Sequence, residues 1–174
     1  MKNILITGFP GIGKTTLIIK LSEIFKEFNP AGFYTAEIIE NGLRTGFELV
    51  SLYGDSKMLA HVNIKSKHSV GKYKIDIKGF ESLLDNIFSR EKKTGLYIID
   101  EIDKMECKSR KFSKLIIALL DSDTPVIASI SEKGTGLIAE IKKREDIKLV
   151  ELTPNNRDLK LKELTMEIRD MLLE

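Results

Sequence analysis

Apolar and polar residues along the chain follow two different periodicities. Short apolar runs rich in β-branched residues and bounded by Gly or Pro predict buried strands. Segments with an apolar residue at every third or fourth position predict amphipathic helices. Strands are expected at 3–7, 96–99, 126–130 and 148–152, and helices at 14–28, 80–88, 111–120, 136–143 and 157–173. This alternation predicts an α/β fold with three layers, in which helices cover both faces of a mainly parallel central sheet.

Residues 32–78 do not follow this alternation. Residues 33–39 and 47–53 have the pattern of extended segments, and Asn41-Gly42 between them favours a tight hairpin turn. Residues 65–78 contain five lysines and a weaker alternation, which indicates a solvated strand face. We therefore predict an antiparallel β insertion after the first helix.

Length and composition restrict the class of protein. A chain of 174 residues fits one domain over residues 1–174. Its net charge of +2 gives no electrostatic reason to expect nucleic acid as the main partner. Cys107 is the one cysteine, so no internal disulfide can form, which fits a reducing compartment. The longest apolar run, 115–120, is far too short to span a membrane. We expect a cytoplasmic monomer that does not contact a membrane.

The segment after the first predicted strand carries the strongest chemical signal. It fits the spacing G-x-x-x-x-G-K-[ST], known as the P-loop or Walker A motif. In such a loop the glycines let backbone N–H groups point at phosphate oxygens, and the following helix presents its positive end to the anion. Lys14 is then expected to contact the β- and γ-phosphates, and the Thr15 hydroxyl to ligate Mg²⁺. The nucleotide-binding residues expected here are Gly8, Phe9, Pro10, Gly11, Ile12, Gly13, Lys14, Thr15 and Thr16.

A second signal lies at the end of the strand predicted at 96–99. Asp100 follows this apolar strand, which is the Walker B pattern, and its carboxylate is expected to hold Mg²⁺ together with Thr15. Glu101 is the next residue and can orient and polarise an attacking water. An acid at this position favours hydrolysis over transfer to an acceptor hydroxyl.

Further candidates come from the rest of the chain. The strand at 126–130 is expected between the P-loop and Walker B strands. It leads into Ser129-Ile130-Ser131, where a hydroxyl is either a γ-phosphate sensor or an ordinary polar strand end. Arg44 and Arg157 are candidates for stabilising transition-state charge. His61 has no metal-ligand partner at useful spacing, so we expect it to face solvent.

Taken together, the motifs resemble the small nucleoside-triphosphatase family first described from thermophiles, which has a cancer-related human relative. The resemblance rests on the P-loop and on the segments 32–37, 44–47, 70–73, 100–106 and 156–158. It implies a P-loop fold of the type with an additional central strand and a catalytic glutamate. It also implies slow hydrolysis of several nucleoside triphosphates, namely ATP, GTP, CTP and UTP, to diphosphates. Nucleotide contacts implied outside the P-loop are Tyr97, Ile98, Ile99, Asp100, Glu101, Ile102, Asp103, Lys104 and Arg157.

One residue departs from the family pattern. Asp103 stands where the family has Gly, so a carboxylate replaces a hydrogen near the expected γ-phosphate. If it points inward it should repel phosphate or recruit metal, and if it points outward it should have no effect. Two alternative functions remain, a P-loop kinase for a nucleotide or metabolite and a binding module that nucleotide regulates. A switch GTPase does not fit, because its guanine-binding and Asp-x-x-Gly motifs do not match.

Overall fold

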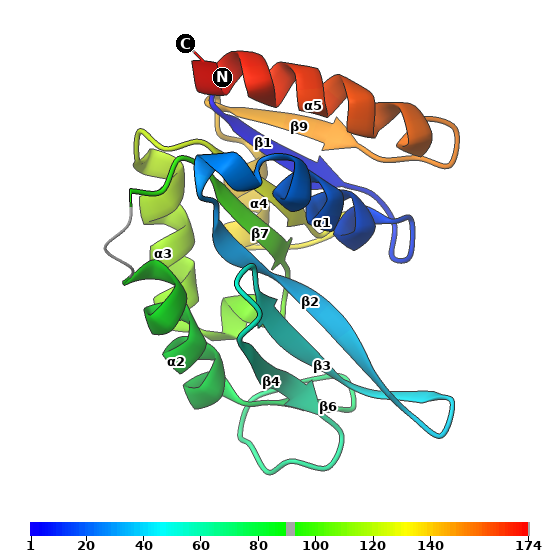
Figure 1. Ribbon diagram of the computed structural model, residues 1–174. Coiled ribbons are helices and arrows are strands. Elements are labelled where there is room, and N and C mark those ends of the chain that lie inside the picture. The colour runs from blue at the N-terminus through cyan, green and yellow to red at the C-terminus, as the bar shows by residue number, and fades with distance from the viewer. Residues whose placement is uncertain (90–92, 174) are drawn as a thin grey trace.

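The computed structural model of this chain describes residues 1–89 and 93–173, and Figure 1 shows its helices and strands. Within these residues one sheet has nine strands in the order β5-β6-β4-β3-β2-β7-β8-β1-β9. The strands are β1 (Asn3–Thr7), β2 (Ala31–Glu40), β3 (Leu43–Ser51), β4 (Ser56–His61), β5 (Ser69–Val70), β6 (Tyr73–Ile75), β7 (Tyr97–Ile102), β8 (Val126–Ile130) and β9 (Ile147–Glu151). The α-helices are α1 (Lys14–Ile24), α2 (Ile77–Phe88), α3 (Arg110–Asp121), α4 (Leu137–Lys142) and α5 (Arg157–Leu173).

The sheet is mixed, with a parallel core and an antiparallel insertion, as the sequence predicts. Strands β2, β7, β8, β1 and β9 pair in parallel, whereas β2–β3, β3–β4, β4–β6 and β6–β5 are antiparallel pairs. The predicted β insertion after the first helix is confirmed, and it joins the parallel part of the sheet through β2. The expected position of β8 between β7 and β1 is also confirmed.

Strand β4 was not predicted as a separate strand, and its packing explains why. Leu59 and Ala60 are consecutive residues, yet both are fully buried. The register between β3 and β4 shifts next to them, between Phe47 and Glu48. A bulge of this kind breaks the alternation of buried and exposed side chains on which strand prediction depends.

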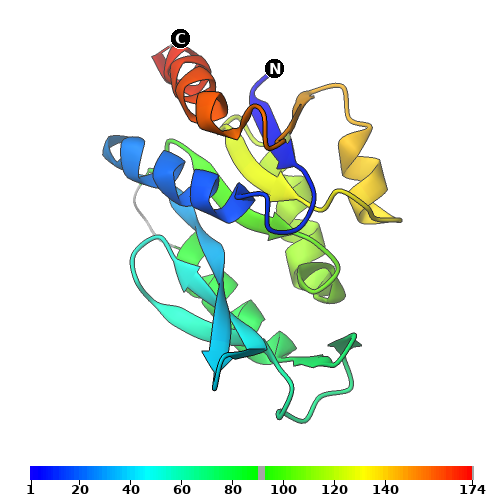
Figure 2. The ribbon, with the colours of Figure 1, turned by 90° about the vertical axis from the view of Figure 1, so that its right-hand side faces the viewer.

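Helices cover both faces of the parallel part of the sheet, as predicted. Figure 2 shows α1 and α5 on one side and α2 and α3 on the other. The first face has a core that includes Ile18 and Leu21 of α1 and Leu164 and Ile168 of α5. The second face has a larger core that continues under the insertion, because α2 packs on β2, β3 and β4. Three rings pack together in this core, Phe33 of β2, Phe80 of α2 and Phe112 of α3, at centroid distances of 5.6–6.3 Å.

Side-chain caps fix where two helices begin. The Asp76 carboxylate accepts a hydrogen bond from the Gly79 N–H at 3.0 Å, so α2 begins at Ile77, before the residue 80 predicted from apolar spacing. The Ser109 hydroxyl oxygen accepts from the Phe112 N–H at 3.0 Å and starts α3 in the same way. Such caps satisfy N–H groups that the first helical turn leaves without partners.

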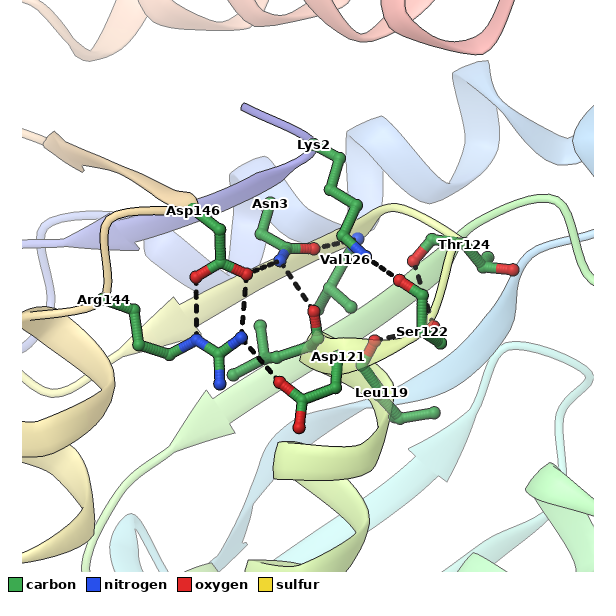
Figure 3. Close-up of polar contacts among 10 residues, drawn as sticks. Lys2, Asn3, Leu119, Asp121, Ser122, Thr124, Val126, Arg144 and Asp146 are labelled. Atoms are coloured by element: carbon green, nitrogen blue, oxygen red, sulfur yellow. Dashed lines mark hydrogen bonds and ion pairs between the residues drawn. The ribbon is translucent and has the colours of Figure 1, made fainter.

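A polar cluster around the buried Asn3 ties together the beginnings of three parallel strands (Figure 3). Asn3 is fully buried, and its side-chain Nδ2 donates to the Leu120 carbonyl and to Asp146, both at 3.1 Å. Its Oδ1 accepts from the Val126 N–H at 3.2 Å. Arg144 completes the cluster with two hydrogen bonds to Asp146, each 2.8 Å long. This cluster lies at the amino ends of β1, β8 and β9. The loop at residues 8–13 lies at the opposite, carboxyl end of β1.

Two further expectations concern the exposure of His61 and the ability of the helices to cross a membrane. His61 was expected to face solvent, but its side chain is buried, with Nε2 at 3.2 Å from a Glu40 carboxylate oxygen. The prediction was wrong because His61 ends β4 and pairs with Gly46 of β3, a neighbour that the local sequence does not indicate. None of the helices in the described part of the chain has the length and hydrophobicity that crossing a lipid bilayer requires.

Candidate nucleotide-binding site

A glycine-rich loop, residues 8–13, joins β1 to α1 at the carboxyl edge of the parallel strands. Gly11 and Gly13 have φ values of +83° and +111°, in the left-handed region that favours glycine. Gly8 is required by space, since a Cβ there would lie 2.6 Å from the Leu152 carbonyl oxygen. Helix α1 starts at Lys14 with Gly13 as its N-cap, and no described side chain caps this end. Its first N–H groups therefore remain available to an anion.

Lys14 connects the two predicted motifs. Its side chain is buried, and its Nζ donates a hydrogen bond of 2.8 Å to the Gly8 carbonyl oxygen. The same Nζ lies 3.6 Å from Oε1 of Glu101. The loop lysine and the acid that follows the Walker B aspartate thus face each other across the site.

Asp100 is the fully buried carboxylate at the centre of the site. Thr15 Oγ1 donates to its Oδ2 at 2.8 Å, and Ser129 Oγ donates to its Oδ1 at 2.5 Å. The Thr35 N–H also donates to Oδ2, at 3.2 Å. Burial raises the pKa of Asp100, while these donors favour the charged form and oppose that rise. The carboxylate is therefore held in one orientation by residues from α1, β2 and β8.

Glu101 follows Asp100 through a cis peptide bond and is partly buried. Its burial raises the pKa of the carboxyl group to about 7, an effect that Lys14 opposes and that the charges of Asp100 and Asp103 reinforce. This group is thus a carboxyl in a low-dielectric setting next to a cation, which is a suitable environment for a residue that exchanges protons with water.

Two more acids, Asp103 and Glu106, lie close enough to Glu101 for their charges to interact. Asp103 is partly buried and its Oδ1 has no hydrogen-bond partner among the described residues. Glu106 is buried, its Oε2 is also without a partner there, and burial raises its pKa well above the ordinary value. The charge of Asp103 raises the pKa of both Glu101 and Glu106. One carboxylate oxygen of Asp103 is thus buried, and its charge raises the pKa of two neighbouring acids. Both observations fit a side chain that points inward, one of the two orientations expected from the sequence.

The structure separates the candidates of the Walker B segment. Tyr97 lies at the start of β7, where it contacts Phe88, so it is at the opposite end of the strand from Asp100. Three residues of strand span about 10 Å. Ile98, Ile99 and Ile102 are fully buried in the two cores. Of the β7 residues, Asp100 lies 2.8 Å from Thr15 and Glu101 lies 3.6 Å from Lys14, whereas Asp103 and the exposed Lys104 follow the strand.

The two candidate arginines lie in different surroundings. Arg44 is on β3, and its contacts are a 3.0 Å hydrogen bond to the Tyr73 hydroxyl, a 2.7 Å ion pair with Glu37 and the face of Phe47. None of these contacts involves the P-loop. Arg157 begins α5 and is exposed, and the segment before it adjoins the P-loop, because the Leu152 N–H donates to Thr7 at 2.8 Å.

Thr35 is the site residue that sequence reasoning missed. Its hydroxyl donates to the Asp100 carbonyl oxygen at 2.7 Å, in addition to the N–H contact with the carboxylate. It lies in segment 32–37, on which the family resemblance partly rests, but threonine is common in strands and nothing in the sequence linked this residue to Asp100. Ser129 was considered as a phosphate sensor, whereas in the structure it donates to Asp100.

A glycine loop on a helix N-terminus, opposite a buried aspartate at the end of a nearby parallel strand, defines a P-loop nucleotide-binding protein. Within that class the comparison with known families is specific. The model of the NTPase family matches residues 3–165, and the chain belongs to this family.

Individual relatives agree with this assignment. The chain is 42% identical over 158 residues to the nucleoside-triphosphatase THEP1 of Thermotoga sp. strain RQ2, and the aligned region covers 88% of each protein. It is similar to the crystal structure of THEP1 from Aquifex aeolicus, with a TM-score of 0.86 and 35% identity, covering 95% of this chain and 98% of that one. It is also similar to the solution structure of a human cancer-related nucleoside triphosphatase, with a TM-score of 0.84, 32% identity and 98% of each chain covered.

Proposed function

We propose that this protein hydrolyses nucleoside 5'-triphosphates to diphosphates and phosphate, with Mg²⁺ as cofactor. The observation that carries the proposal is the convergence of two sequence-distant motifs. Thr15 of the P-loop helix lies 2.8 Å from Asp100, and Lys14 lies 3.6 Å from the adjacent Glu101. Membership in a family whose relatives are named nucleoside-triphosphatases supports the same reaction. In this proposal the fold is the P-loop type with an additional strand, here β8, and a catalytic glutamate, in one domain over residues 1–174.

The residues present fit a magnesium ion. Among the described residues, no group of three or more His, Cys, Asp or Glu side chains could hold a metal. Mg²⁺ in nucleotide sites usually takes only one or two protein oxygens and completes its shell with phosphates and water. The Thr15 hydroxyl and the Asp100 carboxylate, already in contact, are oxygen donors of that kind. A bound Mg²⁺ would supply charge stabilisation on the transferred phosphoryl group.

Each remaining residue then has a defined task. The loop N–H groups and the N-terminus of α1 bind the phosphates, and Lys14 contacts the β- and γ-oxygens. Glu101 orients the attacking water and accepts its proton. Gly8, Phe9, Pro10, Gly11, Ile12, Gly13 and Thr16 form the rest of the binding loop, while Asp103, Lys104 and Arg157 border it. We do not include Tyr97, Ile98, Ile99 or Ile102, because of the positions described above, and Arg44 would have to leave its partners to act.

Product analysis tests the proposal. Purified protein is incubated with Mg²⁺ and each of ATP, GTP, CTP and UTP, with and without nucleoside monophosphates. Release of free phosphate from all four triphosphates without an acceptor is the expected result. Phosphate that appears only on an added monophosphate would refute hydrolysis and indicate a kinase.

A further inference from the structure

The regular pairing between β2 and β7 ends just before the metal-binding acid. Ala31, Gly32 and Phe33 pair with Tyr97, Ile98 and Ile99, and no pairs follow these along the two strands. Strand β2 continues to Glu40 with β3 as its neighbour, and the register of β7 against β8 shifts between Ile99 and Ile102. The main chain of Asp100 therefore leaves the ladder, and its carbonyl group needs another hydrogen-bond donor.

Thr35 supplies that donor. Its hydroxyl donates to the Asp100 carbonyl oxygen at 2.7 Å, and its N–H donates to the Asp100 carboxylate at 3.2 Å. The carbonyl belongs to the peptide group that joins Asp100 to Glu101, so one hydroxyl fixes the link between the two acids. Thr15 and Ser129 contact only the carboxylate in the bonds described above. Thr35 also pairs with Leu49 of β3, which connects the insertion to the site.

We infer that Thr35 is a positioning residue, which sets the orientation of the Asp100 carboxylate and of the Asp100–Glu101 peptide group. The inference rests on the proposed function, because it assigns to Thr35 a role in that same site. Without the hydroxyl, the carbonyl loses its donor and the peptide group can rotate. Affinity for Mg²⁺ should then fall through Asp100, and turnover should fall through Glu101, while the fold persists because the N–H of residue 35 and its pairing with β3 remain.

The test compares wild type with Thr35→Val, which keeps the branched shape, and Thr35→Ser, which keeps the hydroxyl. Calorimetry measures the Mg²⁺ dependence of nucleoside diphosphate binding, and phosphate release gives kcat and KM. Thr35→Val should raise the half-saturating Mg²⁺ concentration and lower kcat, each by about two- to tenfold, the usual range for one hydrogen bond. Thr35→Ser should restore both. Thr165→Val is the matched control, because it removes a hydroxyl bonded to the Leu161 carbonyl on α5, away from the site.

Melting temperature without Mg²⁺ separates positioning from a structural role. A lower melting temperature in Thr35→Val with an unchanged Mg²⁺ midpoint and kcat would overturn the inference. So would equal losses in the Ser and Val variants, since the hydroxyl bond would then not be the cause. Thr35→Ala gives a second deletion of the hydroxyl if Thr35→Val does not fold. Wild-type protein without Mg²⁺-dependent nucleotide binding would instead refute the proposed function, and the inference with it.

Discussion

Replacing Glu101 with glutamine tests the group on which the hydrolase assignment depends. Glutamine keeps the size and shape of the side chain but carries no charge and is a far weaker base. A positioned general base contributes about 10²- to 10⁴-fold to a rate. We therefore expect kcat to fall on the order of 10²-fold or more, which corresponds to a barrier increase of about 2.7 kcal/mol or more.

The same substitution should not weaken nucleotide binding. Glu101 Oε1 lies 3.6 Å from Lys14 Nζ, and neither side chain is more than a quarter exposed. Two unit charges at that distance attract each other by about 4–5 kcal/mol at an effective dielectric constant of 20, before desolvation is subtracted. A bound triphosphate competes for the same lysine. Removing the carboxylate charge should leave the Kd for the nucleotide equal or lower, so the loss appears in kcat with little rise in KM.

The assay pairs steady-state phosphate release with calorimetric nucleotide binding on the same preparations. Glu140→Gln serves as the control, because Glu140 is exposed on α4. This control should keep wild-type kinetics. If Glu101→Gln hydrolyses at the wild-type rate, or if it loses affinity in proportion to activity, Glu101 does not activate water and the reasoning from the site is refuted.

Four further substitutions probe the site and the fold. Lys14→Ala should abolish turnover and strongly weaken triphosphate binding, because it removes the point charge on the β- and γ-oxygens; wild-type-like kinetics would contradict this. Asp100→Asn should shift the Mg²⁺ titration of activity to higher concentration and lower kcat, whereas an unchanged curve would place the metal elsewhere. Asp103→Gly should leave activity equal or higher in the same phosphate assay, since it removes a negative charge beside the phosphate site, and a large loss would assign Asp103 a ligand or base role. Asp146→Asn should lower the free energy of unfolding at pH 7 by less than about 1 kcal/mol, as for other partly exposed ion pairs. Arg144 lowers the pKa of Asp146, so this stabilisation is present above the ordinary carboxyl pKa of about 4 and is lost as pH falls through the lowered value. Urea titrations at pH 7 and at pH 3 check it, and an undiminished difference at pH 3 would exclude the carboxylate.

The parts of the molecule that could be predicted from the sequence are those whose structure is determined by residues close together along the chain. The loop at residues 8–13 combines a strand, a set of glycines and a helix in one continuous segment, and each has a local signal. The acids Asp100 and Glu101 follow an apolar strand in the same way. The hairpin at Asn41-Gly42 was predicted from a dipeptide whose left-handed conformation is required by the turn, and the structure has φ values of +50° and +76° there.

Features that depend on distant residues could not be predicted in this way. The sequence predicts an antiparallel insertion, but it does not show that β2 pairs with β7 on one side and with β3 on the other, because no local pattern encodes that neighbour. His61 is buried at the end of β4, where it pairs with Gly46 of β3, and the residues around it in sequence do not indicate that pairing. Tyr97 was included in the site as part of a continuous segment, but a strand has two ends, and only one of them meets the P-loop.

The environment of Asp100 shows why the sequence predicts a catalytic group more readily than the residues that position it. Its donors Thr15, Thr35 and Ser129 come from α1, β2 and β8. The P-loop pattern predicts Thr15 beside Asp100, but hydroxyl residues are too common in strands for Thr35 and Ser129 to indicate a contact. What brings them together is the strand order β2-β7-β8-β1. One residue contributes to that order through its lack of a side chain. A Cβ at Gly32 would lie 1.7 Å from the Ile98 carbonyl oxygen, so the close pairing of β2 with β7 depends on glycine at this position. The glycine three residues before Thr35 therefore contributes to the geometry around Asp100 without touching it, because it allows β2 to approach β7 closely enough for the threonine to reach Asp100.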